Sequence, residues 1–247
     1  PYFRKAENCE QLSDGDDSFD SALRGVGGPL NVAAVRTRYE ALDIVIDAAE
    51  KLGYPRNHDY NGATQEGFGY YQVTQKNGLR FSAKKAYLQP ARKRPNLRII
   101  THAHVTKISL TGKRADRVHY NRHGKPHCLR AGREVILSAG AIQSPQILEL
   151  SGIGAPDHLR RHGIEVRHEL SGVGSHLTDH YISRLSWRLR RNISLNNHAH
   201  GLGLATEILR YGLTRRGLLS LPAGVLSGLV RSREGLVGPD IHYHIAH

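Results

Sequence analysis

The sequence predicts a mixed α/β (α+β) fold, and three observations support this prediction. From Arg36 to Lys51 apolar residues recur at three- and four-residue steps, the spacing of an amphipathic helix. Phe68–Thr74 and Asn96–Leu110 instead carry the aromatic, β-branched or alternating residues of strands. Glu134–Gly154 combines an apolar run, a turn of small residues and a helical pattern, which is a typical α/β step. A chain of 247 residues is long enough for one large domain or two small ones.

Turn residues delimit the elements expected in the first ninety residues. The helix 36–52 is expected to end at Gly53, a plausible residue for the position after a helix, and Pro55 prevents its continuation. Lys76–Gly78 reads as a tight turn because Asn and Gly tolerate positive φ. The remaining expected elements are a short helix within Pro1–Asp20, a turn at Gly25–Leu30 and a short helix at Phe81–Pro90.

The strongest local pattern in the chain lies at Glu134–Gly154. Its apolar run predicts a buried strand over Glu134–Ser138, followed by small residues that let a ligand approach the backbone closely. Ser144 is then a suitable cap, with Pro145 at the first position of a helix 145–151. The other elements expected beyond residue 115 are strands at Asp116–Tyr120, Ile182–Leu189 and Asp240–Ile245 and a helix around Leu202–Tyr211.

The charge balance is strongly basic, with 35 Lys and Arg residues against 22 Asp and Glu residues, or +13 with His neutral. Such a charge is compatible with a nucleic-acid partner. However, the basic residues are spread along the chain, and aromatic residues make up only 6% of it, too few for extensive base stacking. We therefore interpret the charge as a solvated basic surface and expect no nucleic-acid partner.

Several protein classes are excluded by composition. With only Cys9 and Cys128, the chain has neither a disulfide framework nor a thiolate zinc site. No apolar run approaches the roughly 18 residues that a membrane span needs. The least charged run, Gly217–Val230, is expected to be buried, with a membrane-surface contact as the alternative. The chain contains no Met and starts with Pro1, which indicates an internal piece of a longer protein.

Standard cofactor and metal motifs are absent. No Gly-x-Gly-x-x-Gly fingerprint, P-loop or His-Glu-x-x-His motif occurs. Two histidine groups, His102 with His104 and His242 with His244 and His247, each contain a pair at the two-residue spacing that places imidazoles on one face of a strand. A metal site would need a further ligand, so we interpret both pairs as ordinary strand histidines. The neighbouring Asp179 and His180 are a candidate acid–base pair, although adjacent residues on a strand point to opposite faces.

The segment Ser138–Gly154 resembles, in spacing and identities, the second signature of the glucose–methanol–choline (GMC) flavoprotein oxidoreductases. Within that family the chain is most similar to the bacterial choline-dehydrogenase-like branch. Other segments resemble family elements in the same order along essentially the whole chain: Pro1–Glu7, Gly28–Leu30, Asp59–Gly62, Arg80–Leu88, Gly172–His180 and Pro239–His244. Ser175 and Thr178 depart from the family pattern.

The resemblance implies an organisation into parts of two domains. It predicts the middle part of a GMC-type FAD-binding domain together with part of an antiparallel-sheet substrate-binding domain. Residues 1–97, with the helix 36–52, would be substrate-domain and connecting segments. Residues 98–180, with the helix 145–151, would belong to the FAD-binding domain, and 181–247 would start the substrate-binding domain. The family's Gly-x-Gly-x-x-Gly turn would lie upstream and its catalytic His downstream.

The resemblance also implies a cofactor and a reaction. The cofactor would be FAD, with the backbone of Val105 facing the adenine and the turn at Ala139 and Gly140 as a further contact. The full protein would oxidise a primary alcohol, choline-like or other, and pass electrons to oxygen, a quinone or another acceptor. This piece, lacking the catalytic residues, is expected to be inactive alone. We expect a cytoplasmic location, with peripheral contact at the inner membrane as a variant. The alternative interpretation is a non-catalytic remnant or a basic binding module.

Overall fold

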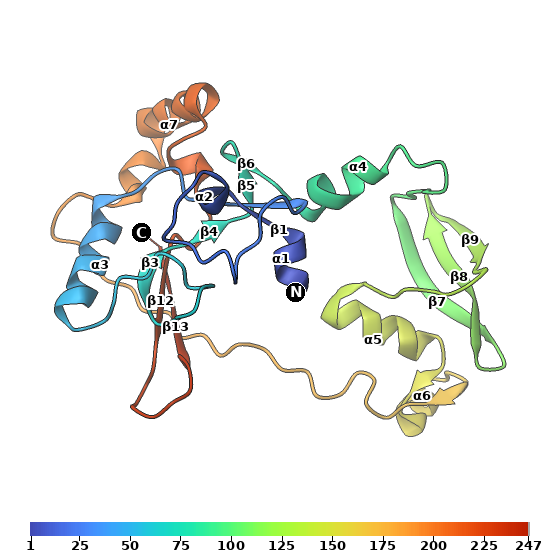
Figure 1. Cartoon of the computed structure of the whole chain (residues 1–247). Coiled ribbons are helices and arrows are strands. Elements are labelled where there is room, and N and C mark those ends of the chain that lie inside the picture. The colour runs from blue at the N-terminus through green and yellow to red at the C-terminus, as the bar shows by residue number, and fades with distance from the viewer. Residues whose placement is uncertain (247) are drawn as a thin grey trace. The chain divides into compact units, whose positions relative to one another are not determined.

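The computed structural model describes residues 1–246, the side chain of Asn197 excepted, and divides them into two compact units. The first unit combines Pro1–Leu97 with Ser186–His247, and the second contains Arg98–Leu185. Helices and strands occur in both, so the predicted mixed fold is confirmed (Figure 1).

Two three-stranded sheets organise the first unit. In one, β1 (Glu7–Cys9) is parallel to β2 (Leu30–Ala34), which pairs antiparallel with β4 (Gln72–Val73). In the other, β12 (Leu226–Val230) lies between β13 (Ile241–Ile245) and β3 (Gly67–Tyr70), antiparallel to both. A hairpin joins β5 (Gln75–Lys76) and β6 (Leu79–Arg80). The helical segments are α1 (Tyr2–Ala6), α2 (Glu10–Ser13), α3 (Glu40–Lys51), a π-helical turn Lys84–Leu88, α4 (Gln89–Ala91), α7 (Gly201–Thr214) and 3₁₀ turns at Leu195–His198 and Leu218–Ser220.

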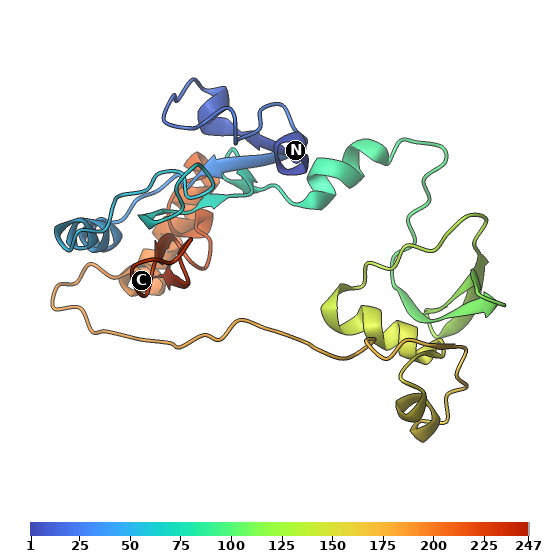
Figure 2. The same cartoon turned by 60° about the horizontal axis from the view of Figure 1, so that its bottom comes forward.

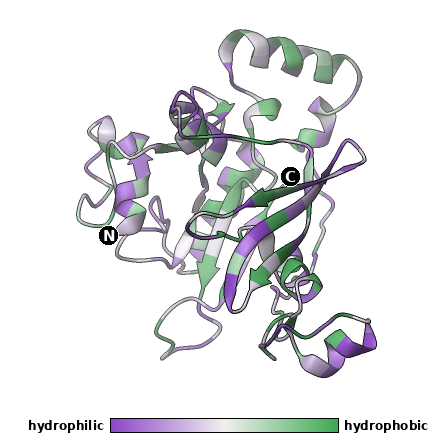
Figure 3. Cartoon of the chain, turned by 90° about the vertical axis from the view of Figure 1, so that its right-hand side faces the viewer, coloured by the Kyte–Doolittle hydropathy of each residue, from purple (hydrophilic) through white to green (hydrophobic). Residues whose placement is uncertain are grey.

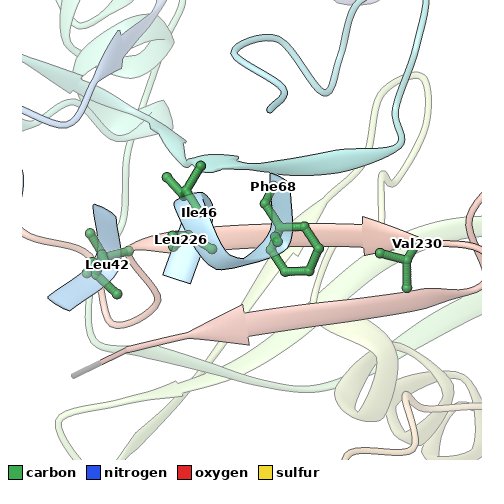
Figure 4. Close-up of a cluster of buried hydrophobic side chains, with 7 residues drawn as sticks. Leu42, Ile46, Phe68, Leu226 and Val230 are labelled. Carbon is green, nitrogen blue, oxygen red and sulfur yellow. The ribbon is translucent and has the colours of Figure 1, made fainter. Parts of the chain in front are cut away.

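The core of the first unit forms where α3 packs on the β3–β12 sheet. Figure 4 shows Leu42 and Ile46 from α3 near Phe68 of β3 and Leu226 and Val230 of β12. The predicted amphipathic helix is therefore confirmed, although it starts at Glu40 rather than Arg36. Burying a Leu, Ile or Phe side chain contributes about 1.5–3 kcal/mol. This core fixes the sheet on which the polar residues described below are placed.

A short-range pattern also fixed the hairpin at residues 75–80. Asn77 and Gly78 both have positive φ, 52° and 70°, as a two-residue turn between antiparallel strands requires. The strand expected over Phe68–Thr74, by contrast, is divided: β3 and β4 belong to different sheets, and Tyr71 is the residue between them.

The second unit is an antiparallel meander with a helix beside it. Its strands β7 (Ala103–Thr111), β8 (Arg114–Arg122) and β9 (Lys125–Arg130) pair in sequence order. The helix α5 (Gly140–Leu150) packs against β7, and both views show it beside the meander (Figures 1 and 2). The remaining elements are α6 (Pro156–Arg161) and the parallel pair β10 (Ile153–Gly154) and β11 (His168–Glu169).

Three expectations for local structure were wrong. Glu134–Ser138 is not a strand, and the side chain of Ile136 is 79% exposed. Ile182–Leu189 is likewise not a strand. A strand needs a hydrogen-bonding partner, and no segment within residues 1–246 pairs with either run. The helix expected at 145–151 starts earlier, at Gly140, and contains Pro145. Instead of capping the helix start, Ser144 Oγ accepts a hydrogen bond from the Ala139 N–H at 3.1 Å.

Candidate functional site

The turn before α5 is open to a ligand. Ala139 is the residue that precedes the helix, and Gly140 starts it with a φ of +90°. Gly adopts that φ more readily than other residues. A Cβ atom added at Gly140 would have no other atom within 4 Å, so the space beside this residue is open. The first N–H groups of a helix have no partner inside it, so they face whatever approaches the turn. The geometry therefore fits a contact between this backbone and a polar group of a cofactor.

Val105 lies in the same unit, half-buried on the edge strand β7, and pairs with Tyr120 of β8. The register of β7 shifts immediately after Val105, which marks a local bulge. The helix is linked to the middle of this strand by Ser151, whose Oγ accepts a hydrogen bond from the Ile108 N–H at 2.8 Å. Val105 and the Ala139–Gly140 turn thus lie on two elements that pack together. Their contact with FAD stays a prediction.

A second group of polar residues, which the sequence alone did not assemble, lies in the first unit. Along β13, Tyr243 stacks on Phe68 and Ile245 packs against the core. Because neighbouring residues of a strand point to opposite faces, His242 and His244 lie on the face away from the core. The register places Ser227 of β12 beside His244 on that face.

Tyr71 joins these histidines. Its hydroxyl lies 2.7 Å from His242 Nε2 and 2.6 Å from His244 Nδ1, and Ser227 Oγ is 3.0 Å from His242 Nε2. A phenol has one proton, so it donates to one imidazole and accepts from the N–H of the other. Burial raises the pKa of Tyr71, although its hydrogen bond with Ser227 opposes the shift, so the hydroxyl stays protonated at neutral pH. We call Tyr71, Ser227, His242 and His244 the polar cluster.

The polar cluster can bind a hydroxyl group and hold a proton, because it combines hydroxyl donors with two imidazoles. Tyr71 also borders a hollow of about 450 Å³ in the same unit, lined among others by Arg38 and His58. The histidine spacing was the only signal in the sequence for this cluster. Tyr71 and Ser227 are far from it along the chain, and only the sheet pairing brings them there.

The other candidates from the sequence are separated. His102 precedes β7 with a φ of +56°, so it does not share a strand face with His104. Asp179 Oδ1 accepts a hydrogen bond from the backbone N–H of His180, at 2.8 Å, in an exposed segment. Within residues 1–246, no three His, Cys, Asp or Glu side chains gather so that they could hold a metal ion. His247, the third member of the His242 and His244 group, lies outside the described residues.

Comparisons with known proteins identify the family. The sequence profile described as GMC oxidoreductase matches residues 2–182. The oxygen-dependent choline dehydrogenase of Vibrio vulnificus is 39% identical over 99% of this chain and 43% of its own length. Human mitochondrial choline dehydrogenase is 38% identical over 99% of this chain and 40% of its own length. The chain thus spans less than half the length of these curated relatives.

A solved structure supports the same assignment. An FAD-dependent oxidoreductase from Chaetomium thermophilum superimposes with a TM-score of 0.77 and 26% identity, over 93% of this chain and 42% of that one. The profile match covers well over half of the sequence, and the resemblance first seen at Ser138–Gly154 lies inside it. The chain therefore belongs to the GMC oxidoreductase family.

Proposed function

We propose that the protein to which this chain belongs is an FAD-dependent oxidoreductase that oxidises a primary alcohol. The observation that carries this proposal is the 38–39% identity to choline dehydrogenases over 99% of the chain. FAD, when bound, supplies the hydride acceptor for the alcohol carbon. The electrons then pass to oxygen, a quinone or another acceptor. The substrate need not be choline, because one fold hosts several chemistries.

The second unit supplies part of the FAD site in this proposal. The backbone at Ala139 and Gly140 approaches the cofactor because no side chain fills the turn. Val105 contributes backbone on the neighbouring strand. Their task is positioning, and the resemblance places the acid–base His outside this chain. The 247 residues by themselves are therefore expected to bind FAD weakly and to have no turnover.

The first unit supplies part of the substrate site. The polar cluster provides a protonated phenol whose oxygen lies 2.7 Å and 2.6 Å from a nitrogen of each of two imidazoles. Such a cluster orients an alcohol hydroxyl by hydrogen bonds and excludes an apolar group from the same place. Tyr71→Phe removes the shared hydroxyl while keeping the ring, so it is expected to raise the KM for the alcohol more than it lowers kcat.

The test uses the full-length product of the gene that encodes this chain. Purified protein should show a flavin absorbance spectrum and reduce a redox dye when a primary alcohol is added. The 247-residue chain should do neither. A full-length product without flavin, or a salt-sensitive gel shift with DNA in place of dye reduction, would support the basic binding module instead.

A matched pair of glycine variants tests the turn. Gly140→Ala and Gly163→Ala both place a Cβ at positive φ, 90° and 68°, and neither Cβ meets an atom within 4 Å. They therefore both add backbone strain of about 1–2 kcal/mol, but only Gly140 lies in the proposed FAD contact. We expect Gly140→Ala to lower the flavin content of the purified protein and Gly163→Ala to retain it. Equal retention in both variants would remove this turn from the site.

A further inference from the structure

Helix α7 turns an apolar face outward. Leu202, Leu209 and Leu213 are 88%, 62% and 77% exposed. Their spacing of seven and four residues places them on one line along the helix. In Figure 3 this helix, at the top, carries green hydrophobic segments between paler and purple ones. A surface helix of a globular protein normally faces its apolar side to the core, so this arrangement is inverted.

Polar contacts hold the helix in this orientation. Its inner side carries the buried Glu207, whose Oε2 accepts a hydrogen bond from the Leu218 N–H at 2.7 Å. Farther along, the Tyr211 hydroxyl donates to the Gly78 carbonyl at 3.2 Å. Because these bonds anchor the inner side, the leucines cannot turn inward without leaving a buried carboxylate unpartnered. The exposed apolar face is therefore a built feature of this unit.

The exposed charged residues in and just after α7 are basic. In the forty-one residues 192–232 the only acidic residue is Glu207, which is buried. Exposed Arg210, Arg215 and Arg216 lie in the last turns of α7 and just after it. An apolar stripe beside exposed arginines is the pattern of a helix that lies in the headgroup region of an anionic membrane.

The length of α7 decides whether this helix could cross a membrane or only lie on its surface. The fourteen residues of α7 extend about 21 Å, shorter than a bilayer core of about 30 Å. Among the described residues, no helix has the length and apolarity that a crossing requires. The run Gly217–Val230, the alternative membrane contact in the sequence, contains the buried strand β12 and is not available for one.

We propose that α7 docks this protein on an anionic lipid surface. Leu202, Leu209 and Leu213 enter the boundary between headgroups and acyl chains. Arg215 and Arg216 contact lipid phosphates at the end of the helix. This contact is peripheral, so it depends on both apolar area and charge.

Vesicle flotation tests the proposal with the full-length gene product. The vesicles are phosphatidylcholine alone or phosphatidylcholine with one quarter phosphatidylglycerol. We expect binding to the anionic vesicles, weakened at high salt because lipid headgroup charges are screened. Leu209→Glu/Leu213→Glu should reduce binding about ten-fold or more. Arg215→Gln/Arg216→Gln should reduce binding to anionic vesicles while leaving the fold unchanged.

The chain offers a matched control for the leucine variant. Leu177→Glu/Leu185→Glu makes the same two changes at residues that are 67% and 65% exposed but lie outside α7. It should bind vesicles like the unmodified protein. Absence of vesicle binding by the unmodified protein, or equal loss in both double variants, would overturn the proposal. A monomer–dimer shift that only the α7 variant abolishes would assign the face to a second copy, which also refutes it.

Discussion

The hydrogen bond between Ser151 and Ile108 controls how α5 sits on the edge strand of the second unit. Ser151 is buried just after α5, where its Oγ donates to the Ile147 carbonyl at 2.5 Å and accepts from the Ile108 N–H at 2.8 Å. Ser151→Ala removes the acceptor without changing the backbone. The Ile108 N–H then stays buried with its partner lost.

An unsatisfied buried donor costs about 1–3 kcal/mol. If that cost falls on the contact between α5 and β7, local opening becomes about 5 to 150 times more populated. Hydrogen exchange followed by mass spectrometry measures this directly in peptides that cover β7. We expect the Ile108 amide to exchange faster by a factor in that range and flavin retention to fall with it.

Ser175→Ala is the control, because Ser175 is exposed and its Oγ donates to a nearby backbone group, the Ser171 carbonyl, at 3.3 Å. It should leave exchange in β7 unchanged. If Ser151→Ala also leaves the Ile108 amide as protected as in this control, the bond does not hold the helix on the strand. The link between Val105 and the Ala139–Gly140 turn would then have another origin.

Three further predictions concern the first unit. Leu226→Ala should lower the free energy of unfolding by about 2–5 kcal/mol, because Leu226 is fully buried in the core and leaves a cavity; denaturant titration measures this. Arg24→Gln should destabilise by about 3–5 kcal/mol in the same assay, since the buried guanidinium pairs with Glu7 and Asp59 and its loss leaves two carboxylates without a cation. Partial burial opposes ionisation of Glu7, but the hydrogen bonds from Arg24 and the Gly25 N–H lower its pKa below the ordinary 4.5. The stability from this shift is present above pH 4.5 and is lost as the pH falls through the lower, folded value; Glu7→Gln should flatten melting temperature against pH in that acid range.

Short-range patterns were sufficient where the deciding interactions are local. Asn77 and Gly78 accept the positive φ of a tight turn, so the hairpin around them was predictable. The helix ending at Lys51 was predictable because its periodicity and Gly53, with a φ of +91°, mark its face and its end. The family was predictable from Ser138–Gly154, because a signature is itself a local pattern.

Sequence patterns gave wrong predictions where pairing with a distant segment of the chain decides the secondary structure. Glu134–Ser138 has the composition of a buried strand, but a strand exists only when another segment supplies its hydrogen bonds. The same reason explains Ile182–Leu189. At Pro145 the sequence indicated a helix start, yet the helix begins at Gly140, whose positive φ turns the chain into α5. The preference of Pro for the first position of a helix says nothing about a turn five residues earlier, so it could not predict this start.

The sequence by itself determined the mixed fold, the family and the turn at Ala139 and Gly140, because these depend on residue type and close spacing. The tertiary structure alone decided that Tyr71 joins His242 and His244, which are more than 170 positions away along the chain. It also decided that α7 faces its leucines outward. Both outcomes depend on which strands pair and which polar groups are satisfied, and those interactions join residues whose separation in the sequence carries no signal.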